Sequence, residues 1–291
     1  MKDLKQTTVI GLGLLGGSIT LSVLRSFPET KVTGYTHRPS TREKARRLSL
    51  ATEIVDDITK SVVGADLVIL ATPIRTFEQT FRQIRGVLPK GCIVTDVGST
   101  KVLPHRWAAE LLGKDVHYVG SHPIAGSERR GLEFARDDLF DRAMCILTTT
   151  KKTNADAFET LRRFWLQLGC FVKSMTPAEH DRTFANISHV PHVVASALIS
   201  ANDSQTLKFA GKGFIDTSRI ASGPANIWAD ILLTNAQNTG RGIDRIIREL
   251  LKLKEAIVTG NEKQTEKLLE TARARRAELI KYKIKEKELL S

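Results

Sequence analysis

The amino-acid sequence predicts an α/β protein in which a doubly wound, mostly parallel sheet is followed by an all-α domain. Up to residue 176, short β-branched runs alternate with segments whose apolar residues recur at helical spacing. This alternation is typical of a parallel sheet with helices on both faces. From Pro177 onward the strand signals stop and only helical patterns remain. We therefore expect two domains, residues 1–176 and residues 177–291.

The individual elements follow from local patterns. Strands are predicted where apolar, β-branched runs are bounded by turn residues, at residues 7–13, 31–36, 65–73, 91–98, 116–123, 144–150 and 170–176. Helices are predicted between them where apolar residues recur at helical spacing, at residues 18–27, 40–50, 75–88 and 155–169. Longer helical patterns cover residues 192–201, 243–260 and 261–290. Gly260 is placed to end one helix and Asn261 to cap the next.

The composition excludes several classes of protein. The chain is 41% hydrophobic and 26% charged, which is near the globular average and excludes a disordered or low-complexity chain. No apolar stretch reaches the roughly 18 residues that span a bilayer, and the N-terminus lacks the cleavage region of a signal peptide. The three cysteines lie far apart, as expected for reduced thiols. We expect a cytoplasmic protein with no membrane association.

The chain is basic, with 44 Lys and Arg against 32 Asp and Glu, a formal net charge of +12. The basic residues are spread along the sequence, and in the densest stretches they alternate with apolar or acidic positions. This spacing is typical of solvated helix faces rather than of a nucleic-acid-binding arm. We expect no nucleic-acid partner, and the charge suits either anionic small molecules or solubility.

The last two predicted helices carry stripes of apolar residues. The stripes comprise Ile243, Ile246, Ile247, Leu250, Leu251, Leu268, Leu269, Ala272 and Leu279. Such residues can belong to an ordinary core. A helical domain of about 115 residues would bury long stripes more easily against a second copy, so we expect a homodimer.

A glycine-rich turn follows the first predicted strand. Gly11, Gly13 and Gly16 form the pattern GxGxxG, with Leu14 and Leu15 inside it, and a helix begins near Gly17. In a strand–turn–helix context this is the dinucleotide-binding turn of a Rossmann domain, where the helix N-terminus faces the pyrophosphate. A degenerate domain without a cofactor would show the same glycines, but the position at the first strand of a complete series favours binding.

The end of the second predicted strand distinguishes NAD from NADP. An NAD site carries Asp or Glu there, about 20 residues past the glycines, to bind the ribose 2′-hydroxyl. This sequence has no carboxylate at that point, and basic or hydroxyl side chains take its place at Thr36, His37, Arg38, Ser40 and Thr41. They suit the 2′-phosphate of NADP. The alternative is NAD, with Arg38 stacked on the adenine.

Further motifs follow later strands. Ala71, Thr72, Pro73 and Gly98 lie at the same predicted sheet edge and are expected to contact the cofactor. The chain contains, in order, GLGLLGGS, ATP, DVGSTK, SHPIAGSE, AEHD, ISHVPH and RIASGPANIW. In these motifs it resembles the prephenate/arogenate dehydrogenases of tyrosine biosynthesis, and the resemblance covers nearly the whole chain. SHPIAGSE followed by SHVPH is far more specific than the glycine turn.

The resemblance implies an oxidative decarboxylation of a cyclohexadiene dicarboxylate. Hydride leaves C4 for the nicotinamide, the C4 hydroxyl proton goes to a base, and CO2 departs as the ring aromatises. The family's catalytic histidine falls on His122, whose ordinary pKa of about 6.5 suits a base. Ser99 matches the serine that binds the same hydroxyl and orients the histidine. Arg219 matches the arginine that binds a substrate carboxylate. The resemblance places His192 against the substrate and Trp228 and Glu128 around the pocket mouth.

Alternatives remain open at this point. Four histidines, His122, His180, His189 and His192, could suggest zinc, but no cysteine or carboxylate completes a set at ligand spacing, so no metal is expected. His180 and Asp181 match an interdomain pair with either a structural or a substrate role. The runner-up function is another two-domain reductase, of the β-hydroxyacid dehydrogenase or imine reductase type. A non-catalytic NADP sensor would lack His122, Ser99 or Arg219.

One departure from the family pattern concerns the substrate pocket. Gly223 stands where the family usually carries Asp before Pro, so the pocket from Pro224 to Trp228 is undefined. Prephenate carries a keto acid side chain and arogenate an amino acid. No acidic residue lies between Arg219 and Trp228 to bind an ammonium, which favours prephenate.

Overall fold

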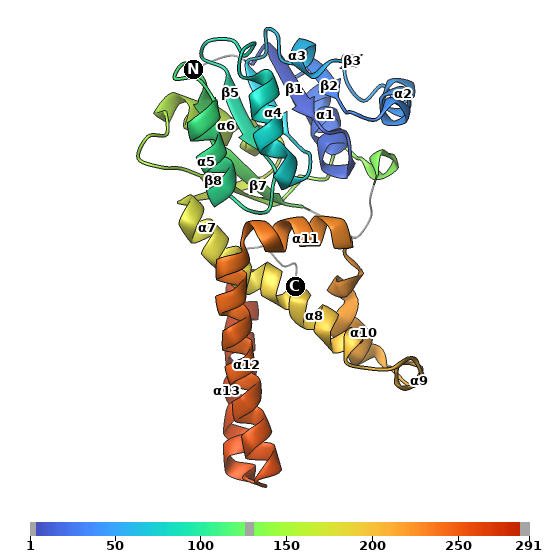
Figure 1. Cartoon of the computed structure of the whole chain (residues 1–291), viewed down its shortest axis with the longest axis vertical. Helices are drawn as coiled ribbons and strands as arrows, with labels where there is room; N and C mark the ends of the chain where they lie inside the picture. The colour runs from blue at the N-terminus through green and yellow to red at the C-terminus, as the bar shows by residue number, and fades with distance from the viewer. Residues whose placement is uncertain (1–3, 126–130, 286–291) are drawn as a thin grey trace. The chain divides into compact units, whose positions relative to one another are not determined.

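The computed structural model describes residues 4–125 and 131–285 (Figure 1). Its contacts divide the chain into two compact units, Met1–Ala236 and Gln237–Ser291. Among the described residues, the first unit holds the strands and the helices up to α11, and the second holds two long helices. The predicted boundary after residue 176 coincides with the change from strands to helices, but its status as a domain boundary stays a prediction.

The first unit is built on a six-stranded parallel sheet of order β3-β2-β1-β4-β5-β6. Its strands are β1 (Gln6–Ile10), β2 (Lys31–Tyr35), β3 (Glu53–Val55), β4 (Leu67–Leu70), β5 (Ile93–Asp96) and β6 (His117–Tyr118). In this register Thr7 of β1 pairs with Val32 on one side and Leu67 on the other. The predicted fold class is confirmed. The sequence analysis missed only the edge strand β3, whose three residues are too few for a clear pattern.

Helices cover both faces of this sheet because successive strand residues point to opposite sides. Along β4, Leu67 and Ile69 belong to one apolar cluster, and Val68 and Leu70 to the other. The first cluster includes α1 (Leu14–Ser26) and α6 (Ala155–Gln167), and the second includes α4 (Phe77–Ile84) and α5 (Val102–Leu111). The shorter elements are α2 (Pro39–Arg47), α3 (Ile58–Ser61), η1 (Ile74–Thr76) and η2 (Leu132–Phe134).

A second sheet of three strands follows, of order β7-β8-β9. It comprises β7 (Gly120–Ile124), β8 (Met144–Thr148) and β9 (Phe171–Met175), with β7 antiparallel to β8 and β8 parallel to β9. The predicted strand 116–123 therefore divides between two sheets. Gly120 stands at the division, where a Cβ would meet the Thr148 hydroxyl at 2.5 Å and the Lys101 side chain at 2.9 Å.

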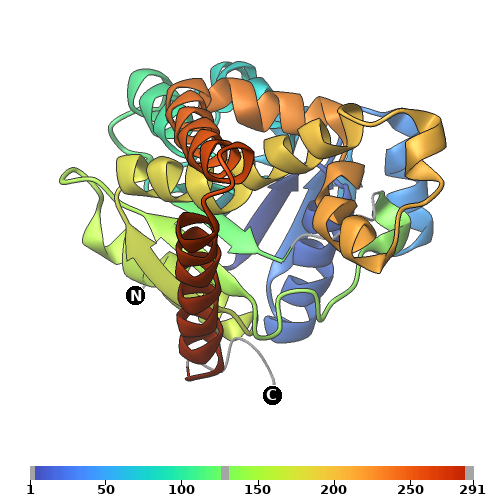
Figure 2. The ribbon, with the colours of Figure 1, turned by 90° about the horizontal axis from the view of Figure 1, so that it is seen from below.

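Helices fill the rest of the first unit. They are α7 (Pro177–Phe184), a π-helical turn η3 (Ala185–His189), α8 (Val190–Ser200), α9 (Ser204–Leu207), α10 (Lys212–Ser218), the 3₁₀ turn η4 (Arg219–Ser222) and α11 (Ala225–Thr234). Thr176 and Glu179 form a capping box that starts α7. In Figure 2 the yellow helix of α7 and α8 runs past the central sheet. α11 lies against the sheet's carboxyl edge, where the Arg75 backbone N–H donates to Asp230 at 3.2 Å.

The described part of the second unit holds α12 (Ala236–Val258), apart from its first residue, and α13 (Glu262–Lys285). Gly260 has a left-handed φ of +66°, and the Asn261 side chain accepts the Gln264 backbone N–H at 3.0 Å. These are the end and the cap that the sequence predicts. Five residues of the predicted stripes are between 48% and 58% exposed in the single chain: Ile247, Leu250, Leu251, Leu269 and Leu279. In the described parts of the chain, no helix is long and apolar enough to cross a membrane.

Candidate active site

The glycine turn has the geometry of a phosphate cradle. Gly11 has a φ of +102°, and Gly16 packs so closely that a Cβ there would lie 1.8 Å from the Gly11 carbonyl oxygen. A Cβ on Gly13, in contrast, would meet no described atom within 4 Å. Gly13 is the N-cap of α1, and no side chain caps the helix there. The turn therefore leaves open space at a helix N-terminus, which fits the pyrophosphate of a dinucleotide.

The turn after β2 is held by an arginine that the sequence analysis did not single out. The Arg42 guanidinium donates to the carbonyl oxygens of Thr36 at 2.8 Å and His37 at 3.0 Å. Thr36 is buried, whereas His37, Arg38 and Ser40 are exposed around the start of α2. Arg42 thus shapes the loop, and Arg38 is the arginine whose side chain is exposed at this corner.

The other predicted cofactor residues lie at the carboxyl ends of β4 and β5. Ala71 and Thr72 are half-buried, and the Thr72 hydroxyl is 2.8 Å from that of Thr76. Pro73 precedes η1. Gly98 is buried, its N–H donates to Asp96 at 2.7 Å, and a Cβ there would meet Ile74 and Asp96 at 2.9 Å. Leu14 and Leu15 begin α1 and are half-buried.

His122 lies on β7 and is joined to helix α7. Its Nδ1 is 2.8 Å from Nε2 of His180, and His180 Nδ1 is 2.8 Å from Oδ1 of Asp181. Both oxygens of Asp181 accept backbone N–H groups from the start of α5, from Lys101 at 2.7 Å and from Val102 at 2.9 Å. The sequence analysis left the role of His180 and Asp181 open, and the structure places both behind His122.

Burial controls the protonation of this cluster. It lowers the pKa of His122 well below its ordinary value, and the nearby His180 and the Lys101 charge act in the same direction. Burial, with Lys101, also lowers the pKa of His180 to about 2. Burial raises the pKa of Asp181, partly offset by the two backbone N–H groups. At neutral pH both histidines are therefore uncharged, as a general base must be before it accepts a proton.

A buried ion pair supports the loop between β5 and α5. The Lys101 ammonium contacts Asp96, and both side chains are fully buried. The other oxygen of Asp96 accepts the Tyr118 hydroxyl at 2.6 Å. A buried pair of this kind is stable only with its hydrogen bonds satisfied. The sequence analysis quoted both residues in DVGSTK but assigned neither a role, because only the fold brings their side chains together.

His192 and Trp228 form a parallel stack on α8 and α11, with ring centroids 3.7 Å apart and planes at 8°. Nδ1 of His192 is buried and has no partner among the described residues. Gly223 closes this corner, because a Cβ there would lie 2.1 Å from Nε1 of Trp228 and 3.2 Å from His192. The stack therefore depends on glycine at 223, and it leaves a polar atom for a ligand.

Ser99, Arg219 and Glu128 are the remaining site residues that the sequence predicts. Ser99 is half-buried after β5, and its backbone faces His189, whose pKa burial lowers to about 4. The Asn235 amide donates to the Asp181 carbonyl at 2.7 Å and lies 3.2 Å from His189 Nδ1. Arg219 begins η4 and is exposed. Glu128 lies outside the described residues.

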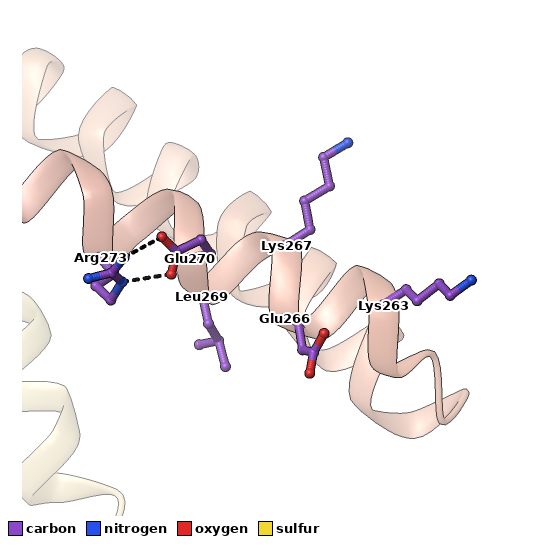
Figure 3. A pocket seen from close by; sticks show the side chains of 6 residues that line it. All are labelled: Lys263, Glu266, Lys267, Leu269, Glu270 and Arg273. Carbon is purple, nitrogen blue, oxygen red and sulfur yellow. Dashed lines mark hydrogen bonds and ion pairs between the residues drawn. The ribbon is translucent and has the colours of Figure 1, made fainter.

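Two other observations concern possible sites. Within residues 4–125 and 131–285, no three His, Cys, Asp or Glu side chains are arranged so that they could hold a metal ion. A shallow groove runs along α13, lined by Lys263, Glu266, Lys267, Leu269, Glu270 and Arg273 (Figure 3). All six come from one exposed helix, and Arg273 already pairs with Glu270 at 2.6 Å. The groove has none of the buried polar groups that converge around His122 and is not a candidate active site.

Two protein-family models match the chain: prephenate dehydrogenase, nucleotide-binding domain, over residues 19–174, and prephenate dehydrogenase, dimerization domain, over residues 176–274. The chain belongs to the prephenate dehydrogenase family. The resemblance stated from the motifs is thereby confirmed, and the alternative of another two-domain reductase is not favoured. The first match begins after the Gly11–Gly16 turn, so the role of that turn rests on its geometry.

Individual relatives agree with this family. A prephenate dehydrogenase from Bacillus subtilis is 35% identical over 265 residues, covering 87% of this chain and 71% of that protein. The structure of Aquifex aeolicus prephenate dehydrogenase with hydroxyphenyl propionate and NAD+ has a TM-score of 0.89 at 33% identity, covering 96% and 99% of the two chains. Synechocystis arogenate dehydrogenase has a TM-score of 0.81 at 30% identity, covering 94% and 99%.

Proposed function

We propose that this family member oxidises and decarboxylates prephenate, or the related arogenate, with a nicotinamide dinucleotide and with His122 as the base. The observation that carries the assignment is the state of His122, a buried, neutral histidine whose Nδ1 is already bonded to His180. Nε2 is then the nitrogen that can face a substrate. The family match supports the same reaction.

The proposal assigns the steps of the reaction to individual residues. The C4 hydroxyl proton goes to Nε2 of His122, and the C4–H electron pair leaves as hydride. The carboxylate carbon then leaves as CO2, and its bonding electrons enter the ring, which becomes aromatic, with the C4 oxygen as a phenolate. That oxygen takes the proton back from His122, which restores the neutral base. The nicotinamide, when bound, would supply the hydride acceptor, and the Gly11–Gly16 turn would hold the pyrophosphate of the dinucleotide. Ser99 is assigned a hydrogen bond to the same C4 hydroxyl.

The substrate carboxylates are assigned to the other end of the site. Arg219 offers a guanidinium to a carboxylate, and Nδ1 of His192 is a buried polar atom in need of a partner. Trp228 holds the His192 ring by stacking, and Glu128 is kept at the pocket mouth as a proposal from the sequence. Prephenate is the preferred substrate in this proposal because residues 219–228 contain no carboxylate for an ammonium.

The cofactor is proposed to be NADP rather than NAD. The exposed Arg38, with His37 and Ser40 nearby, offers positive charge and hydrogen-bond donors at the corner after β2. No carboxylate occupies the end of that strand to bind a ribose 2′-hydroxyl. A cytoplasmic location stays a prediction.

The chain is proposed to act as a homodimer, because its C-terminal helices expose apolar side chains that water disfavours. We expect the protein to sediment at twice the chain mass at micromolar concentration. Replacing Leu250 and Leu251 by Glu should shift it toward monomer, whereas Lys254→Glu, a charge change on the same helix, should not. A wild-type monomer would contradict this proposal.

The decisive experiment compares initial rates with prephenate and arogenate, each with NAD and NADP. We expect the highest kcat/KM with prephenate and NADP. His122→Asn should lower kcat by about two to four orders of magnitude and leave KM nearly unchanged. Arg219→Ala should mainly raise KM. Near-normal turnover in His122→Asn would overturn the assignment of the base.

A further inference from the structure

A line of three buried groups runs from the reacting edge of His122 into the protein. His122 on β7 contacts His180 on α7, and His180 contacts Asp181, each at 2.8 Å. The exposed fractions are 9%, 0% and 1% in that order. His122 and His180 are 58 residues apart in sequence. No solvent competes for these hydrogen bonds, so each proton on the line must have a defined position.

Asp181, at the inner end of this line, determines which ring nitrogen of His180 carries the proton. Oδ1 and Oδ2 of Asp181 both accept backbone N–H groups at the N-terminus of α5, which favours negative charge there. An oxygen that already accepts a hydrogen bond from Lys101 can only accept a second one from His180. The proton of neutral His180 therefore lies on Nδ1, and its Nε2 carries a lone pair.

The tautomer of His180 in turn determines the tautomer of His122. Since Nε2 of His180 is an acceptor, Nδ1 of His122 must be the donor across their 2.8 Å contact. Neutral His122 has a single ring proton, so its Nε2 carries the lone pair. The Phe184 ring restricts both histidine rings. Its centroid lies 4.8 Å from that of the His122 ring, and it stacks on the His180 ring with centroids 4.5 Å apart. A ring flip would break the line and this packing together.

We infer that His180 and Asp181 are positioning residues that hold His122 in the tautomer with its proton on Nδ1 and a lone pair on Nε2. The inference rests on the proposed role of His122 as the base. With the opposite tautomer, Nε2 would present a hydrogen where the substrate hydroxyl must deliver one. When His122 takes up the substrate proton, its Nδ1–H still donates to His180, and the Asp181 carboxylate at the end of the line stabilises the positive charge.

Two substitutions of His180 separate positioning from mere packing. Gln can accept from His122 with its carbonyl and donate to Asp181 with its amide, whereas Leu of similar size can do neither. We expect His180→Leu to lower kcat about 100-fold or more, with KM within about threefold of wild type, since an orienting partner contributes about 10- to 100-fold and a wrong histidine tautomer costs up to about 10⁴. His180→Gln should keep kcat within about tenfold. Equal losses in both variants would overturn the inference, as would a His180→Leu enzyme with normal kcat.

A second measurement needs no turnover. In protein with ¹⁵N-labelled histidine, the ring nitrogen shifts of His122, assigned by their loss in His122→Asn, should show a protonated Nδ1 and a bare Nε2 at pH 7.5. His180→Leu should lose this preference, and His180→Gln should keep it. A proton on Nε2 in the wild type would overturn the inference even if the enzyme is active. Should the wild type turn over neither substrate, the proposed reaction fails, while this spectrum still decides the tautomer.

Discussion

Gly223 shows how one missing side chain shapes the substrate end of the site. A Cβ at this position would lie 2.1 Å from the Trp228 indole nitrogen, and the rigid ring could escape only by leaving its stack on His192. We expect Gly223→Ala to raise the substrate KM about tenfold, the scale of one lost aromatic contact. Steady-state kinetics and Trp fluorescence would measure this.

The matched control is Gly213→Ala on α10. A Cβ there meets nothing within 4 Å among the described residues, so this variant should behave as wild type. The interpretation would be wrong if Gly223→Ala kept both the wild-type KM and the wild-type fluorescence.

Arg38 is the residue on which the cofactor proposal depends. A charge-assisted hydrogen bond to a 2′-phosphate contributes about 1.5–3 kcal/mol, or roughly ten- to over a hundredfold in affinity. Arg38→Ala should therefore lower kcat/KM with NADP by about that factor and leave the value with NAD unchanged. The wild-type preference should also shrink as salt increases, since exposed charges are screened.

Arg47, exposed at the other end of α2, supplies the comparison for this test. Arg47→Ala removes the same charge from the same helix but should change neither cofactor's kcat/KM by more than about twofold. A wild-type enzyme that prefers NAD tenfold would refute the cofactor proposal and leave Arg38 as an adenine-stacking residue.

At the scale of elements, the β1–α1 turn contains two glycines with different roles. Gly16 allows close packing, and Gly13 leaves space for a ligand. Gly16 must be glycine for packing, because a Cβ would lie 1.8 Å from the Gly11 carbonyl oxygen. A Cβ on Gly13, in contrast, would meet nothing within 4 Å among the described residues. We expect Gly16→Ala to destabilise the fold by about 1–3 kcal/mol, as overpacking does. Gly13→Ala should change stability by less than about 1 kcal/mol yet weaken dinucleotide binding at least tenfold.

Thermal unfolding and a fluorescence titration with the dinucleotide would separate the two effects. Unchanged binding in Gly13→Ala would show that the pyrophosphate does not lie at this turn. Unchanged stability in Gly16→Ala would show that the close packing of the turn is not needed for the fold.

The helix that carries three of the histidines is interrupted for a local reason. Pro191 has no N–H to offer the carbonyl of Ile187, and its ring disfavours a regular turn before it. The chain widens into the π-helical turn Ala185–His189 just there, a feature often found at functional sites. The turn changes the helical register between His180 on α7 and His192 on α8. A 3.6-residue pattern in the sequence does not contain this shift.

At the scale of the whole molecule, buried histidines make stability depend on pH. Burial lowers the pKa of His105 and His189 to about 4 and of His180 to about 2, and it also lowers that of His122. Below the ordinary value of about 6.5, the unfolded chain binds protons that the folded chain refuses, so stability falls as the pH decreases. Asp181, whose pKa is raised, acts in the opposite direction nearer pH 4.

We therefore expect the free energy of unfolding to decrease from pH 6.5 toward pH 4, by up to about 1.4 kcal/mol per pH unit for each such histidine. Urea unfolding at fixed protein concentration, at pH values from 7.5 to 4.5, would measure the slope. His180→Gln removes one titrating group and should make the slope shallower by about one proton. Constant stability between pH 7 and pH 5 would contradict the prediction.

The sequence by itself determined the main sheet, the glycine turn and the family. These depend on patterns within a few residues, such as the alternation along β4 or the spacing of Gly11, Gly13 and Gly16, and on motifs that keep their order along the chain. The cap at Asn261 was equally local, since a cap involves neighbouring residues only.

Only the tertiary structure decided which side chains of the site contact one another. It placed β7, β8 and β9 in a second sheet, with β7 antiparallel to β8. It also joined His122 to His180, paired Lys101 with Asp96 inside the protein, and set Gly223 against Trp228. Each of these contacts depends on how separate elements pack, and for a single sequence no local period encodes which distant side chain will be the partner. Burial then decides the chemistry, because exclusion of water turns an ordinary histidine into a neutral base with one defined proton.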